Sequence, residues 1–341
     1  MNYQEVLAQA KLDIGPLCKV CPECNGVACK GRIPGPGGKG SGLGFIRNYQ
    51  ALRNIRLNMD TVYAPKGVDT RFSLFGKAFK LPVFAAPVGA VALHYSPKHD
   101  DLSYSRAVLN GCLAAGSAGF TGDGVKDEVY AGTMEAIRGI GGMGVPTIKP
   151  WSLKEVLLKA KMAQDAGAFA FAMDIDAAGL IVLAMQGKPV APMPVETIAE
   201  IAASVNMPFI LKGVMTADGA RKALAAGAKG IVVSNHGGRV LDETPSTIEI
   251  LPSIVAAVGG KMTILIDGGF RTGIDVFKAL ALGAQGVLIG RPFTYMVYGG
   301  GAEGVRLYLE KVQAELSEAM LMTGASSLAD INVGKISGGS S

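Results

Sequence analysis

Residues 230–239 read GIVVSNHGGR, an apolar, β-branched run that leads directly into polar residues around one histidine. An imidazole titrates near neutral pH, so His236 at the end of a buried strand is a candidate general base. Arg239, three residues later, can bind a carboxylate through two parallel hydrogen bonds. The chain has only two other histidines. We expect His94 and His99 to be loop or surface residues, because their neighbours offer no comparable chemistry.

Two later apolar runs end in glycines followed by an arginine, in the stretches DGGFRTG and IGRP. Exposed glycine amides donate hydrogen bonds to anions, and Arg271 and Arg291 add positive charge and forked donors. Tight turns alone would explain either stretch, but both together favour a phosphate site.

Lys212 ends the apolar run PFILKGV. A lysine at the end of a barrel strand can form a Schiff base, or it can stay charged beside an anionic ligand such as a reduced flavin. The residue types leave both possibilities open.

Near the N-terminus the stretch CKVCPECNGVACKG has the spacing C-x2-C-x2-C-x4-C, close to that of bacterial ferredoxins. Four thiols within twelve residues indicate metal binding by Cys18, Cys21, Cys24 and Cys29. An iron–sulfur cluster and a structural zinc ion are equally compatible with this pattern. A cluster would predict a dehydrogenase that passes electrons to a carrier protein. The alternative without metal is a set of redox or structural thiols.

From Leu81 onward, short apolar runs alternate with helix-length segments, which indicates parallel strands buried on both faces. Eight such units predict a (β/α)8 TIM barrel over residues 81–341. Residues 1–80 form a separate N-terminal extension, helical at first and then rich in cysteine and glycine. An open doubly wound sheet is the alternative, but no G-x-G-x-x-G follows the first strand. The expected strands are PVFAAPVG, SAGFTGDG, VPTIKP, AFAFAMDID, PFILKGV, GIVVSNHG, MTILIDGG and GVLIGRPF.

The composition of the 341-residue chain, 49% hydrophobic with a net charge of +5, is that of a protein with a large core. No basic run is dense enough to indicate nucleic-acid binding. The most apolar window contains Asp174 and Asp176, so we read it as a buried strand and loop, and we expect no membrane span. The N-terminus lacks the apolar region of a signal peptide. We therefore expect a cytoplasmic protein with a small-molecule substrate, whose cysteines are thiols or metal ligands and form no disulfides.

The stretches AAP, LKGV, VSNHGGRVLD and IDGGFRTGIDVFKALALGAQGVLIGRP resemble the FMN-dependent α-hydroxy-acid dehydrogenases and oxidases. The resemblance is strongest over residues 208–293 and weak before residue 81. It implies bound FMN, oxidation of a 2-hydroxy acid or a related hydroxyl compound, and a homo-oligomer.

The same resemblance implies functions for single residues. His236 takes the proton from the substrate, Asp174 stabilises the resulting imidazolium, Lys212 lies beside the flavin, and Arg239 binds the substrate carboxylate. The residues expected to contact FMN are Ala86, Pro87, Thr147, Lys212, Ser234, Asp267, Gly268, Gly269, Arg271, Gly290 and Arg291.

The chain departs from the family pattern where substrate should bind. A glutamine and a tyrosine of the family are here Thr147 and Lys149, and the threonine before the fourth-strand aspartate is Ala172. The second carboxylate-binding arginine has no counterpart, and GRIPGPGGKGSG replaces the N-terminal tyrosine pair. Lys149 is the candidate for the missing cation. The flavin site is therefore expected to be intact and the substrate site rebuilt.

Two alternatives to hydroxy-acid oxidation remain at this point. One is an FMN-dependent isomerase of the isopentenyl diphosphate isomerase type, which the SNHGGR element disfavours. The other is a non-catalytic barrel that binds phosphate or flavin.

Overall fold

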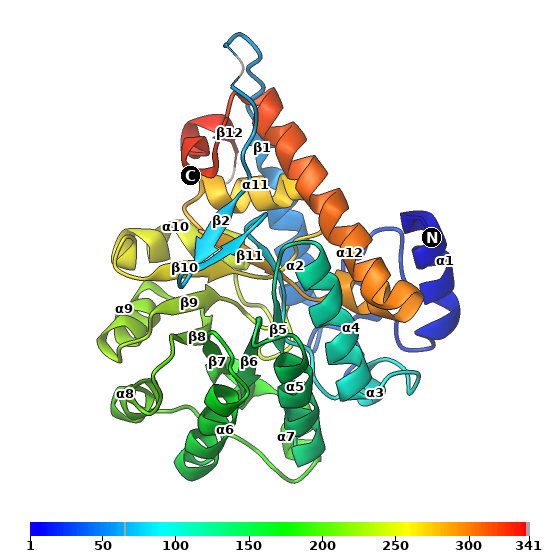
Figure 1. Ribbon diagram of the computed structural model, residues 1–341, viewed down its shortest axis with the longest axis vertical. Coiled ribbons are helices and arrows are strands. Elements are labelled where there is room, and N and C mark those ends of the chain that lie inside the picture. The colour runs from blue at the N-terminus through cyan, green and yellow to red at the C-terminus, as the bar shows by residue number, and fades with distance from the viewer. Residues whose placement is uncertain (65, 339–341) are drawn as a thin grey trace.

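A computed structural model describes residues 1–64 and 66–338 and contains a closed barrel of eight parallel strands (Figure 1). Their order around the barrel follows the chain from β4 to β11. All eight predicted strands and the TIM barrel are confirmed, and the doubly wound alternative is wrong. The strands are β4 (Val83–Ala85), β5 (Gly119–Thr121), β6 (Gly144–Ile148), β7 (Phe171–Asp174), β8 (Phe209–Val214), β9 (Gly230–Val233), β10 (Thr263–Ile266) and β11 (Gly286–Ile289).

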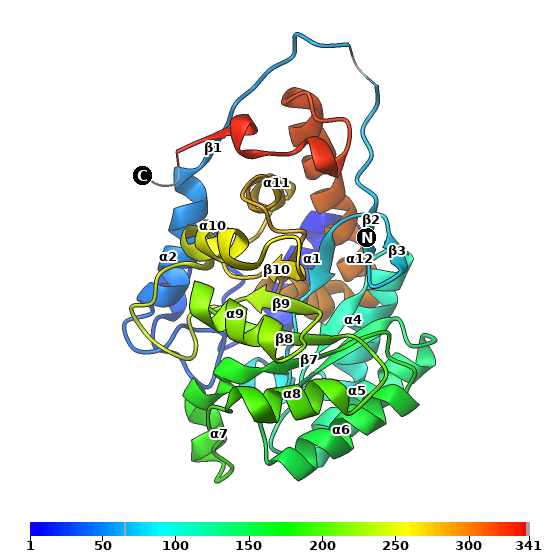
Figure 2. The same cartoon turned by 90° about the vertical axis from the view of Figure 1, so that its left-hand side faces the viewer.

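Helices surround the barrel, because each strand is followed by a segment whose apolar face packs against the sheet. Helices α8 to α11 follow one another along the side that faces the viewer in Figure 2. The helices are α3 (Val91–His94), α4 (Asp101–Ala114), α5 (Asp127–Gly139), α6 (Leu153–Asp165), α7 (Ile181–Met185), α8 (Val195–Ala203), α9 (Ala217–Ala225), α10 (Thr247–Val258), α11 (Gly273–Ala281) and α12 (Arg291–Met322).

The interior of the barrel is a packed core to which every strand contributes one buried apolar side chain. These residues are Phe84, Phe120, Val145, Ala172, Ile210, Val232, Leu265 and Leu288. A hairpin of β2 (Phe72–Leu74) and β3 (Lys77–Phe79) joins the same cluster, and the Phe79 ring packs edge-on against Phe84 with centroids 5.1 Å apart. The filled interior leaves the C-terminal ends of the strands as the place for a ligand.

The N-terminal extension lies against the barrel. Helix α1 (Tyr3–Asp13) packs on α12, and α2 (Leu43–Asn54) packs on α10. The short strands β1 (Arg56–Leu57) and β12 (Ile336–Ser337) pair with each other. The sequence predicted α1 but not α2. We keep the boundary at residue 80 as a proposal, supported by the start of β4 at Val83.

The segment after β7 differs from the predicted loop. It forms a 3-10 turn, η2 (Ile175–Gly179), followed by α7. No helix in the described part of the chain combines the length and the apolar character that a bilayer crossing needs.

Candidate active site

A pocket opens at the C-terminal ends of the barrel strands and encloses about 1140 Å3, part of it open to solvent. Nearly all the residues predicted to contact FMN line it. They are Ala86, Pro87, Lys212, Asp267, Gly268, Gly269, Arg271, Gly290 and Arg291. Of the remaining predicted contacts, Thr147 and Ser234 are fully buried and are not part of the lining.

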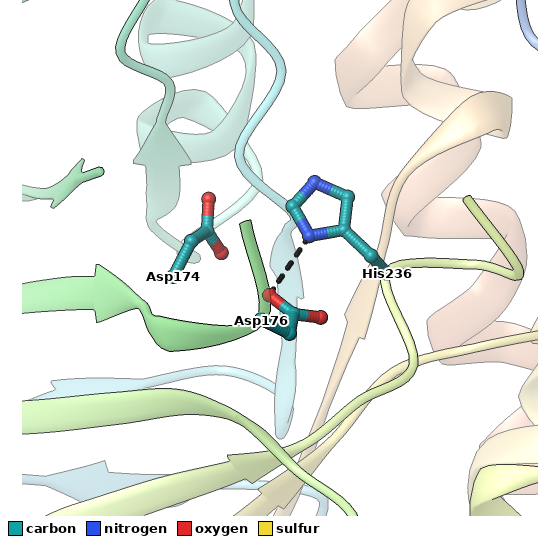
Figure 3. Close-up of side chains that lie close together, drawn as sticks. All are labelled: Asp174, Asp176 and His236. Atoms are coloured by element: carbon teal, nitrogen blue, oxygen red, sulfur yellow. Dashed lines mark hydrogen bonds and ion pairs between the residues drawn. The ribbon is translucent and has the colours of Figure 1, made fainter. Parts of the chain in front are cut away.

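His236 lies in the pocket wall, and its Nδ1 is 3.0 Å from Oδ1 of Asp176 (Figure 3). The predicted partner was Asp174, and for this contact the prediction is wrong. Asp174 is close, with an oxygen within 4.8 Å of the imidazole, but its carboxylate is bonded elsewhere. Burial lowers the pKa of His236 below its ordinary value, and the charge of Asp176 offsets only part of this effect. The imidazole is therefore neutral at pH 7 and able to accept a proton.

The position of Asp176 depends on a bulge in the neighbouring strand. The register between β8 and β9 shifts at Lys212–Val214, and Gly213 there has φ +98°. A Cβ on Gly213 would lie 2.5 Å from the carboxylate carbon of Asp176. Only glycine adopts this backbone conformation and also leaves space for the carboxylate. Sequence reasoning assigned no function to Asp176, although the Asp-Ile-Asp spacing of the chain was a signal for it.

The loop that carries His236 is held in an uncommon conformation. His236 has φ +56°, and its N–H donates to Oγ of Ser234 at 3.0 Å. The next restraint is Asn235, which exchanges side-chain hydrogen bonds with the buried Asn48 of α2 at 2.7 and 3.1 Å. A positive φ at a residue other than glycine is typical of functional sites, where the surrounding bonds offset the strain.

Asp174 is held between two lysines. Its Oδ2 accepts from Nζ of Lys149 at 2.7 Å, and its Oδ1 lies 3.0 Å from Nζ of Lys212. Lys212 also lies 3.6 Å from Asp267. Burial alone would raise the pKa of Asp174, but the two ammonium groups outweigh burial and hold it well below its ordinary value.

The same contacts decide between the two chemistries left open for Lys212. Burial opposes its charge, but Asp174, Asp267 and Asp176 together raise its pKa above the ordinary value. A Schiff base forms from an uncharged amine, and the ammonium of Lys212 stays charged. The possibility that Lys212 forms a Schiff base is therefore wrong. Lys149 lines the pocket and its Nζ is paired with Asp174; its assignment as the second cation for the substrate carboxylate stays a prediction.

Three arginines line the pocket without an acidic partner. Within residues 1–64 and 66–338, no carboxylate lies within 4.0 Å of the guanidinium of Arg239, Arg271 or Arg291. They donate instead to backbone carbonyls, including Gly35, Cys24 and Pro36. Burial and the nearby Arg291 lower the pKa of Arg239 to about 10. Clustered, half-buried guanidinium groups without counter-ions are suited to bind anions.

The N-terminal extension contacts residues that line the pocket and holds them in place. Arg239 donates to the carbonyls of Gly35 and Gly37, and the Gly35 N–H donates to Nδ1 of His94 at 3.3 Å. His94 lines the pocket, so its predicted place in a surface loop is wrong. Burial, together with the charges of Arg239 and Lys149, lowers the pKa of His94 to about 3, so this ring stays neutral.

Buried polar groups at the strand ends fit a flavin with several hydrogen-bonding edges. In the described part of the chain, Oγ1 of Thr121, Oγ1 of Thr147 and Oδ1 of Asp267 are buried without a hydrogen-bond partner. Such groups normally find a partner, which a bound ligand can supply. Gly268 and Gly269 have φ of +99° and +91°, which exposes bare backbone at the pocket.

The four predicted metal-binding cysteines are free thiols outside the pocket lining. Among the residues that the structure describes, no three of their sulfurs lie within 4.8 Å of one another. Over residues 1–64 and 66–338, Asp174, Asp176 and His236 are the one group of His, Cys, Asp or Glu side chains close enough to hold a single ion. Lys149 and Lys212 neutralise Asp174, so a cation there is electrostatically disfavoured.

The chain matches the family model described as FMN-dependent dehydrogenase over residues 36–182 and 142–337. The 4-hydroxymandelate oxidase of Amycolatopsis orientalis is 31% identical over 338 residues, which cover 86% of this chain and 89% of that protein. The L-lactate oxidase of a Nostoc species is 51% identical over 126 residues, 37% of this chain and 34% of that protein. A crystal structure of a mandelate oxidase variant with 2-hydroxy-phenylacetamide has a TM-score of 0.80 and 29% identity, covering 100% of this chain and 99% of the other.

These relatives are oxidases and dehydrogenases, which confirms the predicted cofactor and reaction class and disfavours both the isomerase and the non-catalytic barrel. The pocket, its unpaired arginines and its neutral histidine agree with that result. The chain belongs to the FMN-dependent dehydrogenase family and is an FMN-dependent oxidoreductase of the type that oxidises 2-hydroxy acids.

Proposed function

We propose that this enzyme oxidises a 2-hydroxy acid with an apolar side group to the 2-keto acid, with His236 as the base. The observation that carries the proposal is a neutral imidazole hydrogen-bonded to Asp176 in a pocket that also contains unpaired guanidinium groups. Bound FMN supplies the acceptor for the two electrons that the substrate loses.

Asp176 determines which nitrogen of His236 reacts. A carboxylate can only accept, so the bond requires the proton on Nδ1 and leaves the lone pair on Nε2. Figure 3 shows Nε2 pointing away from Asp176. We infer that Nε2 takes the substrate proton and that Asp176 stabilises the imidazolium that forms. Lys212 adds a fixed positive charge to the pocket wall, which favours negative charge on the reduced cofactor.

We assign the unpaired arginines to two anions. Arg271 and Arg291 follow β10 and β11, the usual place of a phosphate in barrels of this type, so they and Gly268, Gly269 and Gly290 hold the FMN phosphate and nearby atoms. Arg239 is near His236 in the chain and binds the substrate carboxylate. The neutral His94 lies beside it, in contact with its guanidinium at 3.4 Å.

The pocket wall after β7 is mostly apolar. Leu180, Val182 and Leu183 line it together with the exposed Gln186, in the segment where the family pattern led us to expect a second arginine. A side chain that removes apolar surface from water there contributes about 0.8 kcal/mol per CH2 group. We therefore propose that the substrate carries a larger apolar group than glycolate or lactate.

We also infer a cytoplasmic location, because the five cysteines are all free thiols, as expected in a reducing compartment. The homo-oligomer and the carrier protein remain predictions.

Replacing Arg271 and Arg291 together by alanine should release FMN, because the phosphate loses its charged partners. The measurement is the flavin content after gel filtration. Arg306→Ala is the control, since Arg306 pairs only with Glu303 and Glu310 on the surface of α12. Full flavin retention in the double variant would place the phosphate elsewhere.

His236→Gln should keep bound FMN but slow its anaerobic reduction by substrate about 10²–10⁴-fold, the usual contribution of a general base. Stopped-flow absorbance of the flavin measures the rate. Reduction at the wild-type rate would contradict the assignment of the base.

Asp176→Asn should lower the rate on the order of 10²-fold or more, because the imidazolium loses its stabilising charge. Since Asp176 raises the pKa of His236, its removal should also move the acid limb of kcat/KM to lower pH. Asp174→Asn is the comparison. It leaves two lysines buried without their partner, so its main effect should be a loss of stability of about 3–5 kcal/mol. If Asp174→Asn instead lowered the rate and moved the acid limb, while Asp176→Asn mainly lowered stability, Asp174 would be the partner of His236.

The kcat/KM for a 2-hydroxy acid with an isobutyl group should exceed that for glycolate by at least about tenfold, because the isobutyl group buries apolar surface that glycolate lacks. Leu180→Asn should reduce that preference, whereas Leu158→Asn on the exposed face of α6 should not. Equal kcat/KM for the two acids in the unsubstituted enzyme would refute the apolar subsite.

A further inference from the structure

The segment Cys18–Cys29 has no part in the reaction described so far. The family match begins at residue 36, so the shared activity does not explain why four cysteines precede it. The segment joins α1 to α2 and contains no regular element except the 3-10 turn η1 (Val27–Cys29).

The cysteine side chains turn inward while their neighbours face water. All four cysteines are half-buried, and Cys18 and Cys24 pack against the main apolar core. The residues between them are mostly exposed. These are Lys19, Pro22, Glu23, Val27 and Ala28. The four thiols therefore lie on the partly buried side of this segment.

All four cysteines are free thiols, and Sγ of Cys29 donates to the carbonyl of Gly26, a buried residue of the same segment, at 3.8 Å. Thiolate sulfurs are the ligands that iron–sulfur clusters require. Four half-buried thiols within one short segment are therefore suited to hold a metal centre.

The cysteine segment adjoins the flavin pocket through one side chain. Nη2 of Arg271 donates to the Cys24 carbonyl at 2.7 Å and lies 3.6 Å from the Cys24 sulfur, while Arg271 also lines the pocket. A second arginine, Arg291, stacks on the Phe45 ring at 3.6 Å, and Gly26 lies against the same ring. A metal held by these thiols would therefore be close to the cofactor.

The place of the segment distinguishes the two metals that the spacing left open. A zinc ion has no redox chemistry, whereas an iron–sulfur cluster accepts and donates single electrons. Because the segment lies beside the pocket of a redox cofactor, its position favours the cluster over zinc.

We propose that Cys18, Cys21, Cys24 and Cys29 bind a [4Fe–4S] cluster beside the flavin pocket, and that this cluster passes electrons from the flavin to an external one-electron carrier protein. The electron-transfer part rests on the proposed function. The substrate loses two electrons and two protons. The cluster takes one electron at a time and reduces two equivalents of the carrier, and both protons go to water.

The first test is the metal content of the full chain, purified without oxygen. We expect about four iron and four sulfide per chain and a paramagnetic signal after reduction by dithionite. Cys21→Ser should lose the iron but keep FMN, while Cys112→Ala, a buried cysteine outside the segment, should keep both. If the unsubstituted protein contained no iron, or one zinc ion per chain, the cluster would be refuted. This result does not depend on whether Cys21→Ser folds.

The second test follows the electrons. Without oxygen, the 2-hydroxy acid with an isobutyl group should first bleach the flavin of the unsubstituted protein and then produce the paramagnetic signal. In Cys21→Ser it should bleach the flavin without producing the signal. A bleached flavin without that signal would overturn the electron transfer and leave the proposed function intact. A flavin that substrate does not bleach at all would count against the proposed function instead.

Discussion

The hydrogen bond between His236 and Asp176 fixes the proton on one nitrogen of the imidazole and leaves the other free to react. Several neighbouring residues hold the two partners of this bond in position. Gly213 leaves space for the carboxylate, and Ser234 and Asn235 hold the histidine in its left-handed conformation. Asn48, from the N-terminal extension, completes the restraint, so the extension is part of the active site.

Charge in the pocket is divided between paired and unpaired groups. Lys149 and Lys212 hold Asp174 in a buried ion-pair network, which keeps Asp174 and Lys212 charged and keeps Lys212 from acting as an amine nucleophile. Arg239, Arg271 and Arg291 have no carboxylate partner among the described residues and donate mainly to backbone carbonyls. The paired charges set the electrostatic field of the pocket, and the unpaired charges remain for the anions of cofactor and substrate.

Part of this arrangement could be predicted from the sequence. Parallel strands of a barrel end at one mouth, so apolar runs ending in Lys212, His236 and Arg291 were sufficient to bring these residues together. The choice between Asp174 and Asp176 could not be made, because it depends on where β7 ends and on the bulge at Gly213.

Contacts between the extension and the barrel were also beyond prediction. Nothing in the sequence near His94 indicates that Gly35 and Arg239 surround it. The position of the cysteine segment beside Arg271 has the same origin, since it depends on how glycine-rich and proline-rich backbone crosses the pocket mouth. Such long-range contacts between irregular segments leave no periodic pattern in a sequence.

The most direct test of this account is the protonation state of His236, measured by nitrogen NMR of protein labelled at its three histidines. Single His→Gln variants assign the signals. The account predicts that at pH 7 His236 is neutral, with its proton on Nδ1, and that it titrates below the ordinary histidine pKa of about 6.5. An imidazolium at pH 7, or a neutral ring with its proton on Nε2, would contradict the assignment of Nε2 as the base.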